Sequence, residues 1–318
     1  MAGSPDSVPW RGAWQVALYG SQGFYRRPEG PAGHFTTSAV GIPHATPILS
    51  QALINLADRH QLNTIVDFAA GGSGLIGTIA ELDPSKRCVA VDITERPPSL
   101  SADIEWWRAG GGAVLPTEWA GLHGCLVIAH EWLDVVPCPV AQRDERDTWR
   151  LVLVDSDGAE SLGAPVSGAD LDWLSKWVPD GVTRAEVGNA RDQAWNGLCA
   201  GISDGLAVAI DYGHEYAERP VNGTLIGFRQ GRAVTPLLDG STDITAHVAV
   251  DSLAQDTRAK QREILADLLP AMALPSHALA STQPAAYLQG LATHGAWTTL
   301  RAPGGLGEFW WVQRALGR

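Results

Sequence analysis

Glycines and acidic residues follow two apolar runs of the sequence at a spacing that could hold a nucleoside cofactor. The first run contains Asp67 and leads into Gly71, Gly72 and Ser73, and the second run ends at Asp92. Glycine lets the backbone approach a ligand closely, and an acid at the end of the next strand can hold ribose hydroxyls. The pattern therefore predicts a nucleoside-cofactor site in an open α/β sheet.

The loop pattern is compatible with two classes of cofactor, a dinucleotide and S-adenosylmethionine. Residues 72–77 match the GxGxxG pattern of dinucleotide-binding loops, which is a weak signal when it stands alone. Asp67 argues against a dinucleotide, because an anion at that position would repel the pyrophosphate. The same anion suits the sulfonium and amino group of S-adenosylmethionine. The charge favours S-adenosylmethionine; a nicotinamide cofactor and a glycine turn without a ligand are the alternatives.

A second group of polar residues, from His130 to Asp134, directly follows the apolar run 125–129. Ligands of open α/β sheets lie outside the carboxyl ends of the strands, so we expect Glu131 and Asp134 in the cofactor crevice. Two carboxylates there could bind a cationic substrate through charge-assisted hydrogen bonds. A zinc site would need a helical segment and a third ligand, so we predict no metal. An acyl-transfer nucleophile is also disfavoured, because Ser73 lacks the second glycine of GxSxG.

A third group lies further along the chain. Asp211 and Tyr212 end the apolar run 206–210 and are predicted to bind substrate in the same crevice. His247 lies in the run 243–248 and could act as a base or contact the substrate. An isolated histidine is more often an ordinary hydrogen-bonded residue, and that interpretation stays open.

Composition limits the class of protein. The chain has 318 residues, 45% of them hydrophobic, and a formal net charge of −12. This charge argues against nucleic acid as a partner and is compatible with a basic peptide or a cationic small molecule. No apolar run is long enough to cross a bilayer and the N-terminus has no signal-peptide pattern, so we expect a cytoplasmic protein without a membrane partner. The four cysteines form no CxxC pair and are expected to be buried.

Alternating strand and helix patterns predict a parallel sheet with crossover helices. The expected strands are residues 64–68, 88–93, 125–129, 206–210, 297–301 and 309–313, with a hairpin at 149–166. The expected helices are residues 47–59, 74–82, 252–269 and 283–294, one helix around Leu171, Leu174 and Trp177, and one that opens with a capping box at 183–186.

The domain division follows from these patterns. Residues 1–45 are rich in glycine, proline and aromatic residues and are predicted to form a loop-rich segment that closes over the cofactor site. Residues 46–318 are predicted to form one α/β domain, with an insertion at about 149–203.

In these motifs the chain resembles the MidA family of S-adenosylmethionine-dependent methyltransferases, whose mitochondrial members assist complex I assembly. The segments that resemble the family patterns are His130–Pro137, Asp211–Gly213, Asp243–Val248, Gly33–Thr37 and Pro303–Phe309. They span nearly the whole chain in the family's order, which makes the resemblance more specific than any one motif.

The resemblance implies a class I, Rossmann-like methyltransferase sheet with helices on both faces and a helical or hairpin insertion. It also implies methyl transfer to a protein arginine. Carried over residue by residue, Asp67, Gly71 and Asp92 would hold S-adenosylmethionine, while Glu131 and Asp134 would lie beside the methyl acceptor.

Departures from the family lie in or near this site, and one of them is the segment Ala39–Pro43. Ala69 and Ser73 stand where the family tends to have glycines, His34 replaces an aspartate, and His130 replaces an asparagine. We assign His130 to the cofactor and His34 to the substrate. The departures leave a second hypothesis open, in which the chain is a catalytically inactive assembly or binding protein. Its partner would be a protein or peptide with a basic side chain, or a cationic small molecule.

Overall fold

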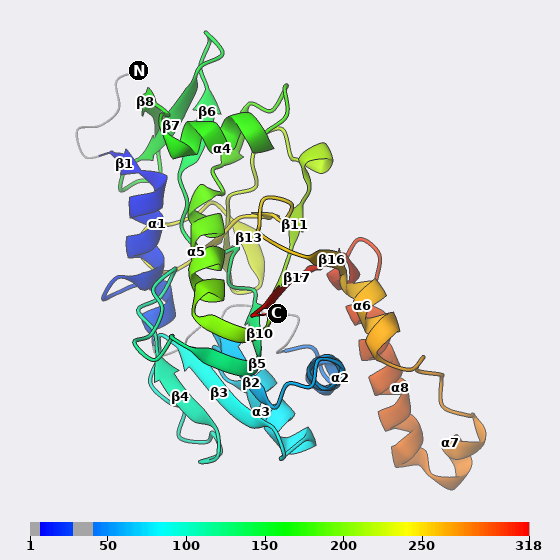
Figure 1. The fold of residues 1–318 in the computed structure, drawn as a ribbon. Helices are drawn as coiled ribbons and strands as arrows, with labels where there is room; N and C mark the ends of the chain where they lie inside the picture. The colour runs from blue at the N-terminus through cyan, green and yellow to red at the C-terminus, as the bar shows by residue number, and fades with distance from the viewer. Residues whose placement is uncertain (1–6, 28–40, 318) are drawn as a thin grey trace.

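A seven-stranded sheet forms the centre of the computed structural model, which describes residues 7–27 and 41–317 (Figure 1). The strand order is β16-β17-β10-β5-β2-β3-β4. The pairs among β10, β5, β2, β3 and β4 are parallel, whereas β17 runs antiparallel to both β10 and β16. The strands are β2 (Thr64–Phe68), β3 (Arg87–Asp92), β4 (Glu105–Arg108), β5 (Leu122–His130), β10 (Ile202–Asp211), β16 (Thr257–Lys260) and β17 (Trp310–Leu316).

Helices cover both faces of this sheet, because its strands carry apolar residues on both sides. One face packs against α2 (Ala45–Arg59), α3 (Gly74–Leu82), α6 (Gln261–Leu268) and the end of α8 (Pro284–Leu300). The opposite face packs against α5 (Asn189–Ala200). The connections reverse direction between β2 and β5, and such a switch point opens a ligand crevice at the carboxyl ends of the strands. The predicted α/β class I architecture is confirmed.

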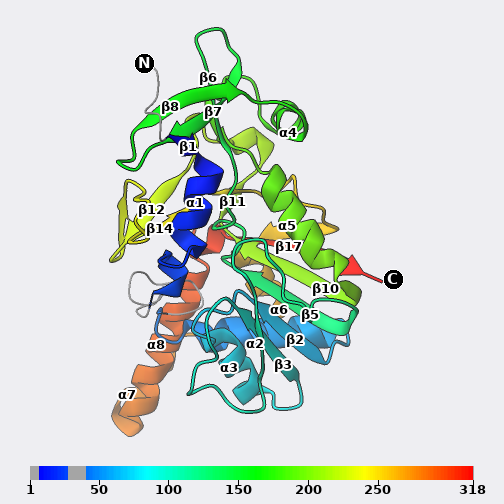
Figure 2. The same ribbon diagram turned by 90° about the vertical axis from the view of Figure 1, so that its left-hand side faces the viewer.

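A second sheet lies at one end of the molecule, beyond the central sheet (Figure 2). Its strand order is β1-β7-β6-β9, with β8 paired to β7. The β7–β8 hairpin confirms the hairpin predicted at 149–166. The elements are β1 (Val8–Pro9), β6 (Val140–Arg143), β7 (Trp149–Val154), β8 (Glu160–Pro165), β9 (Arg184–Glu186) and α4 (Ala169–Trp177).

Two smaller sheets follow β10 in the sequence. The pair β11 (Gly213–His214) and β15 (Val248–Ala249) is parallel, and a three-stranded sheet contains β12 (Ile226–Arg229), β13 (Arg232–Val234) and β14 (Asp243–Thr245). The short helix α7 (Ala278–Thr282) and the adjoining part of α8 extend away from the rest of the chain in both views (Figures 1 and 2). No helix among the described residues combines the length and apolar character needed to span a bilayer.

Several local predictions are wrong. Within the segment expected to be loops, Trp10–Tyr19 form the helix α1, which buries Trp10, Trp14 and Leu18 against residues of the second sheet. The capping box at 183–186 does not begin a helix: those residues include strand β9, and α5 begins at Asn189.

Two predictions near the C-terminus also fail. The strand expected at 297–301 is instead the last turn of α8, and the helix expected at 252–269 is preceded by β16 and covers only Gln261–Leu268. The apolar residues 296, 297 and 300 pack on α2 and the sheet with helical spacing, which a short apolar run does not distinguish from a strand. The four cysteines are free and buried, as predicted.

Candidate active site

The glycine loop between β2 and α3 adopts a backbone that L-residues rarely accept. Ala69, Gly71 and Ser73 have φ angles of +63°, +53° and +58°. A Cβ added at Gly71 or at Gly72 would meet nothing within 4 Å, so there is open space beside the loop. The loop thus leaves room for a ligand against its backbone, as a cofactor-binding turn requires.

Asp92, at the end of β3, holds this loop in place. Its Oδ2 accepts a hydrogen bond from the Gly71 N–H at 2.9 Å, and its Oδ1 accepts bonds from the Thr94 N–H and hydroxyl at 2.9 and 2.7 Å. Burial raises the pKa of Asp92, whereas these hydrogen bonds lower it.

Asp67, in β2, is a buried acid of the cofactor region with one oxygen atom that accepts no hydrogen bond from the described residues. Its side chain is buried, and its Oδ2 has no hydrogen-bond partner within the described chain. Burial, together with the negative charge of Asp92, raises the pKa of Asp67 to about 7, while a hydrogen bond from the Ile76 backbone opposes the shift. A buried carboxyl oxygen without a hydrogen-bond partner is costly, and a cationic ligand would relieve that cost. The residues present therefore fit S-adenosylmethionine.

The second half of the site begins where β5 ends. Glu131 has a φ of +50°, and its N–H donates to the Ile210 carbonyl at 2.8 Å. A non-glycine residue in this conformation is strained, and such strain concentrates at functional positions. The Nε2 atom of His130 lies 3.8 Å from Oε1 of Glu131. Burial lowers the pKa of His130 to about 4, so this histidine is neutral at physiological pH.

Asp134 is the centre of the second half. Its Oδ2 accepts hydrogen bonds from the Tyr212 hydroxyl at 2.6 Å and from the Thr245 hydroxyl at 2.8 Å. Its Oδ1 is buried and has no hydrogen-bond partner among residues 7–27 and 41–317. Burial and the charge of Glu131 raise the pKa of Asp134. Asp243, which accepts a hydrogen bond from the Tyr25 hydroxyl at 2.9 Å, also has its pKa raised by burial and by Asp134.

Asp211 binds the backbone of the turn that contains Leu133 and Asp134. Its Oδ2 accepts the N–H groups of Leu133 and Asp134 at 3.0 and 3.1 Å, and its Oδ1 accepts the N–H of Tyr212 at 2.9 Å. Both oxygens are thus occupied by backbone donors. These bonds fix the backbone of residues 133, 134 and 212, and the substrate contact expected of Asp211 stays a prediction.

Arg191 was not identified from the sequence. Its side chain is fully buried in α5, and it donates to the carbonyl oxygens of Val136, Ala246, His247 and Asp134 at 3.1, 3.0, 2.9 and 2.5 Å. It therefore joins the 131–136 turn to the 243–248 run. No local pattern around residue 191 signals this role, because its partners lie 55 to 57 residues away.

The structure brings most of the predicted residues together in these two groups. The ring of His247 meets that of Tyr212 edge-on, with the centroids 5.2 Å apart. His34 and the rest of the Gly33–Thr37 motif lie outside the described residues. Within the described part of the chain, no group of three histidine, cysteine, aspartate or glutamate side chains is arranged to hold a metal ion.

Comparison with known proteins identifies the family. The profile of a family of S-adenosyl-L-methionine-dependent methyltransferases matches residues 59–266, which is more than half of the chain. No curated protein matches the sequence.

Solved structures agree with the fold. A Burkholderia thailandensis protein crystallised with S-adenosyl-homocysteine is 22% identical, with a TM-score of 0.72 over 98% of this chain and 88% of that one. A native structure of an uncharacterized protein from the same organism is also 22% identical, with a TM-score of 0.71 and the same coverage. With the glycine loop, its two acids and the sheet order already established, this chain belongs to the family of S-adenosylmethionine-dependent methyltransferases that its resemblance to MidA predicted.

Proposed function

We propose that this methyltransferase acts on a nitrogen atom of a cationic acceptor, with an arginine side chain of a protein as the first candidate. The observation that carries the proposal is the buried group of carboxyls around Asp134, whose Oδ1 has no hydrogen-bond partner in the described part of the chain. Glu131, Asp211 and Asp243 all contribute negative potential there. Arg191 is a nearby cation, and four of its five N–H donors bind carbonyl groups.

In this proposal the cofactor is held by Asp67, Gly71, Gly72, Ser73 and Asp92, with His130 at the border between cofactor and acceptor. When bound, S-adenosylmethionine supplies an electrophilic methyl group on a sulfonium. The protein's own task is then mainly to position a nitrogen lone pair in line with that methyl group.

Glu131 and Asp134 would orient the acceptor and receive its proton. The bound sulfonium would supply the methyl group and would keep the electron pair of the broken C–S bond, while Glu131 or Asp134 would take the proton that the nitrogen loses. Burial favours this step, because a raised pKa makes the Asp134 carboxylate a stronger base. The hydroxyls of Tyr212 and Thr245 hold Oδ2, which leaves Oδ1 for the acceptor.

The N-terminal segment would complete this site. Tyr25 contacts Asp243, and the Tyr19 hydroxyl donates to the Val135 carbonyl at 3.0 Å. These two hydrogen bonds, which join the described part of residues 1–45 to Val135 and Asp243, support a closing role for the segment. We propose that the segment closes over the bound cofactor and that His34 contacts the substrate.

The test uses the full chain, labelled S-adenosylmethionine and a cell extract, with labelled proteins and small molecules separated and identified. We expect Glu131→Gln to bind S-adenosylhomocysteine about as well as the unmodified chain, while labelling falls by about 100-fold or more, as is typical for loss of a general base. Glu118→Gln, at an exposed glutamate, is the matched control.

Two outcomes would count against the proposal. Equal labelling by Glu131→Gln would remove Glu131 from the mechanism. Labelled products that carry the methyl group only on oxygen, sulfur or carbon would exclude a nitrogen acceptor.

A further inference from the structure

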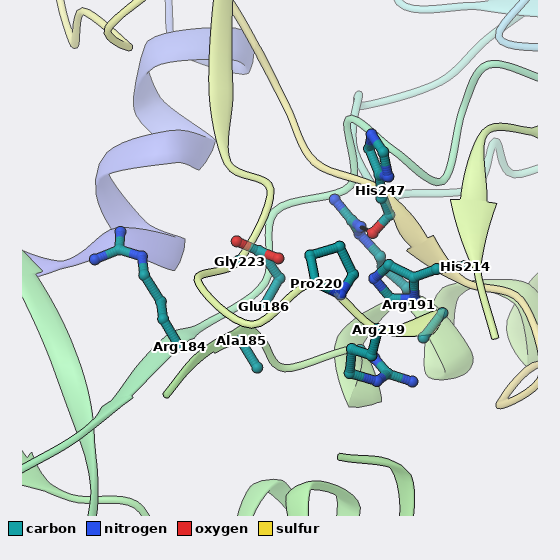
Figure 3. A pocket seen from close by; sticks show the side chains of 11 residues that line it. Arg184, Ala185, Glu186, Arg191, His214, Arg219, Pro220, Gly223 and His247 are labelled. Atoms are coloured by element: carbon teal, nitrogen blue, oxygen red, sulfur yellow. Dashed lines mark hydrogen bonds between the residues drawn. The ribbon is translucent and has the colours of Figure 1, made fainter. Parts of the chain in front are cut away.

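A small pocket lies beside the second half of the site, the group of residues around Asp134, and next to the β11–β15 pair (Figure 3). We call it the arginine pocket, and its polar lining is Arg184, Glu186, Arg191, His214, Arg219 and His247. In Figure 3, His214, Arg219 and His247 lie on one side of the pocket and Arg184 on the other. Because β11 and β15 are parallel neighbours, they bring His214 close to His247, with ring centroids 6.1 Å apart.

Arg219 is the unusual residue of the arginine pocket. Its side chain is only 3% exposed, yet its Nε and Nη2 atoms have no hydrogen-bond partner within the described chain. The nearest carboxylate oxygen, Oδ1 of Asp251, lies 3.7 Å from Nη2, which is too far for a hydrogen bond. The guanidinium also lies 5.4 Å from the ring centroid of Trp173. A buried guanidinium with unused donors is costly unless a ligand supplies the missing acceptors.

His214 adds a second unused polar atom. The residue is 7% exposed, and its Nδ1 has no partner among the described residues. Burial and the charge of Arg219 lower the pKa of His214 to about 3, so the imidazole is neutral and can present an N–H at Nδ1.

Two other charged groups of the pocket, Glu186 and Arg184, already form hydrogen bonds with other residues. Glu186 accepts the Thr224 N–H at 2.9 Å, the Thr224 hydroxyl at 3.0 Å and the Leu225 N–H at 3.0 Å. Arg184 forms a bidentate pair with Glu160, both bonds at 2.7 Å. Among the described residues of the lining, Arg219 and His214 carry the buried nitrogen atoms without a hydrogen-bond partner, and both residues suit an anion.

The arginine pocket connects to the proposed reaction centre through aromatic contacts. His247 lies between His214 and Tyr212, and the Tyr212 hydroxyl donates to Asp134. Arg191 donates hydrogen bonds to the backbone carbonyls of both Asp134 and His247, and so fixes these two residues relative to each other. The side chains of His247 and Tyr212 thus lie between the arginine pocket and Asp134.

We propose that the arginine pocket binds an oxyanion, a carboxylate or a phosphate, that belongs to the methyl acceptor. This assignment to the acceptor rests on the proposed function, whereas anion binding by the pocket does not. The acceptor would then carry a cationic nitrogen beside Asp134 and an anionic group against Arg219 and His214.

The first experiment measures binding of two probes, inorganic phosphate and acetate, to the full chain by calorimetry at constant ionic strength. We expect saturable binding of at least one probe, weakened by about tenfold in Arg219→Gln, as suits loss of a charge-assisted bond, and less in Arg219→Lys. Arg232→Gln, at an exposed arginine, should bind like the unmodified chain. A preference for phosphate or for acetate decides which oxyanion the pocket takes.

A second variant, His214→Phe, tests the pocket independently in case Arg219→Gln does not fold. His214→Phe removes the unused Nδ1 and keeps a ring of similar shape, so it should fold and still bind the probe more weakly. The proposal would be overturned if neither probe shows saturable binding, or if Arg219→Gln and His214→Phe both bind the probe as tightly as the unmodified chain does.

The link to the acceptor has its own readout. Once a labelled acceptor is in hand, Arg219→Gln should raise KM far more than it lowers kcat, and excess probe should compete with the acceptor. Probe binding without competition would overturn the link to the acceptor. If no cationic acceptor is methylated while the probe still binds through Arg219, the proposed function fails and the anion pocket stands.

Discussion

Cofactor affinity should depend on the ionisation of Asp67. A carboxyl group with a pKa of about 7 is largely protonated just below neutral pH, and only its anion attracts a sulfonium or an ammonium group. We therefore predict that S-adenosylmethionine binds more tightly as the pH rises through 7. Binding should also release a proton, because a cation beside Asp67 lowers its pKa.

The size of the effect follows from that pKa. Asp67 would be ionised to about one-tenth at pH 6 and about nine-tenths at pH 8. When only one form binds, the apparent dissociation constant is the intrinsic value divided by the fraction of that form. The affinity should thus rise by about tenfold between pH 6 and pH 8, which is about 1.4 kcal/mol.

Calorimetry over this pH range, in buffers with different ionisation enthalpies, measures both the affinity and the proton released. Asp67→Asn is neutral at every pH, so it should bind weakly and without this pH dependence. Glu81→Gln, at an exposed acid of α3, is the matched control and should follow the unmodified chain. A tenfold rise that persists in Asp67→Asn, or constant affinity in the unmodified chain, would refute the assignment of Asp67 to the cofactor.

Two further predictions concern the residues that shape the site. Arg191→Met should lower the free energy of unfolding by about 3–5 kcal/mol in urea titrations, because four buried carbonyls lose their donor, and Arg191→Lys should not restore it. Retained stability in Arg191→Met would refute this role. Ala69→Gly should raise the free energy of unfolding by about 1 kcal/mol, because it relieves a positive φ, and Ser73→Gly should gain less, because it loses the bond from the Ser73 hydroxyl to the Gly72 carbonyl at 2.7 Å. A loss of stability in Ala69→Gly would contradict the strain argument.

The central sheet was the most predictable part of the fold. The strand at 64–68 and the helix at 74–82 occur at the predicted residues. Here the local signals agree: an apolar run fully buried in the sheet, a glycine turn, and a helix whose residues Leu75, Ile76 and Ile79 pack against it. Agreement between turn chemistry and hydrophobic spacing is what makes a local prediction reliable.

Tertiary contacts explain where the predictions failed. The Thr-x-x-Glu pattern at 183–186 is a good capping box, but Glu186 instead binds the backbone of residues 224 and 225. Those partners are 38 and 39 residues away, so no local pattern shows them. In α1, the spacing of Trp10, Trp14 and Leu18 is helical, yet the surrounding glycines and aromatic residues concealed it.

The residues of the candidate site also fall into those that local sequence patterns predicted and those that only tertiary contacts reveal. Acids at the ends of strands were found from sequence, because position at a strand end is a local property. Arg191 and Arg219 were missed, because each acts on groups far away in the chain. Arg219 is identified only once burial and unused donors are known.

The distribution of charge gives the site two opposite ends. Around Asp134, buried carboxyls outnumber the single guanidinium of Arg191, and that guanidinium is bound by carbonyl oxygens. Beyond Tyr212 and His247, the described residues Arg219 and His214 carry buried nitrogen atoms without a hydrogen-bond partner. Opposite charges held apart on a rigid frame favour an acceptor with the complementary arrangement and disfavour one with either charge alone. An acceptor bound at both ends would also have its nitrogen fixed in place, and methyl transfer requires this positioning above all.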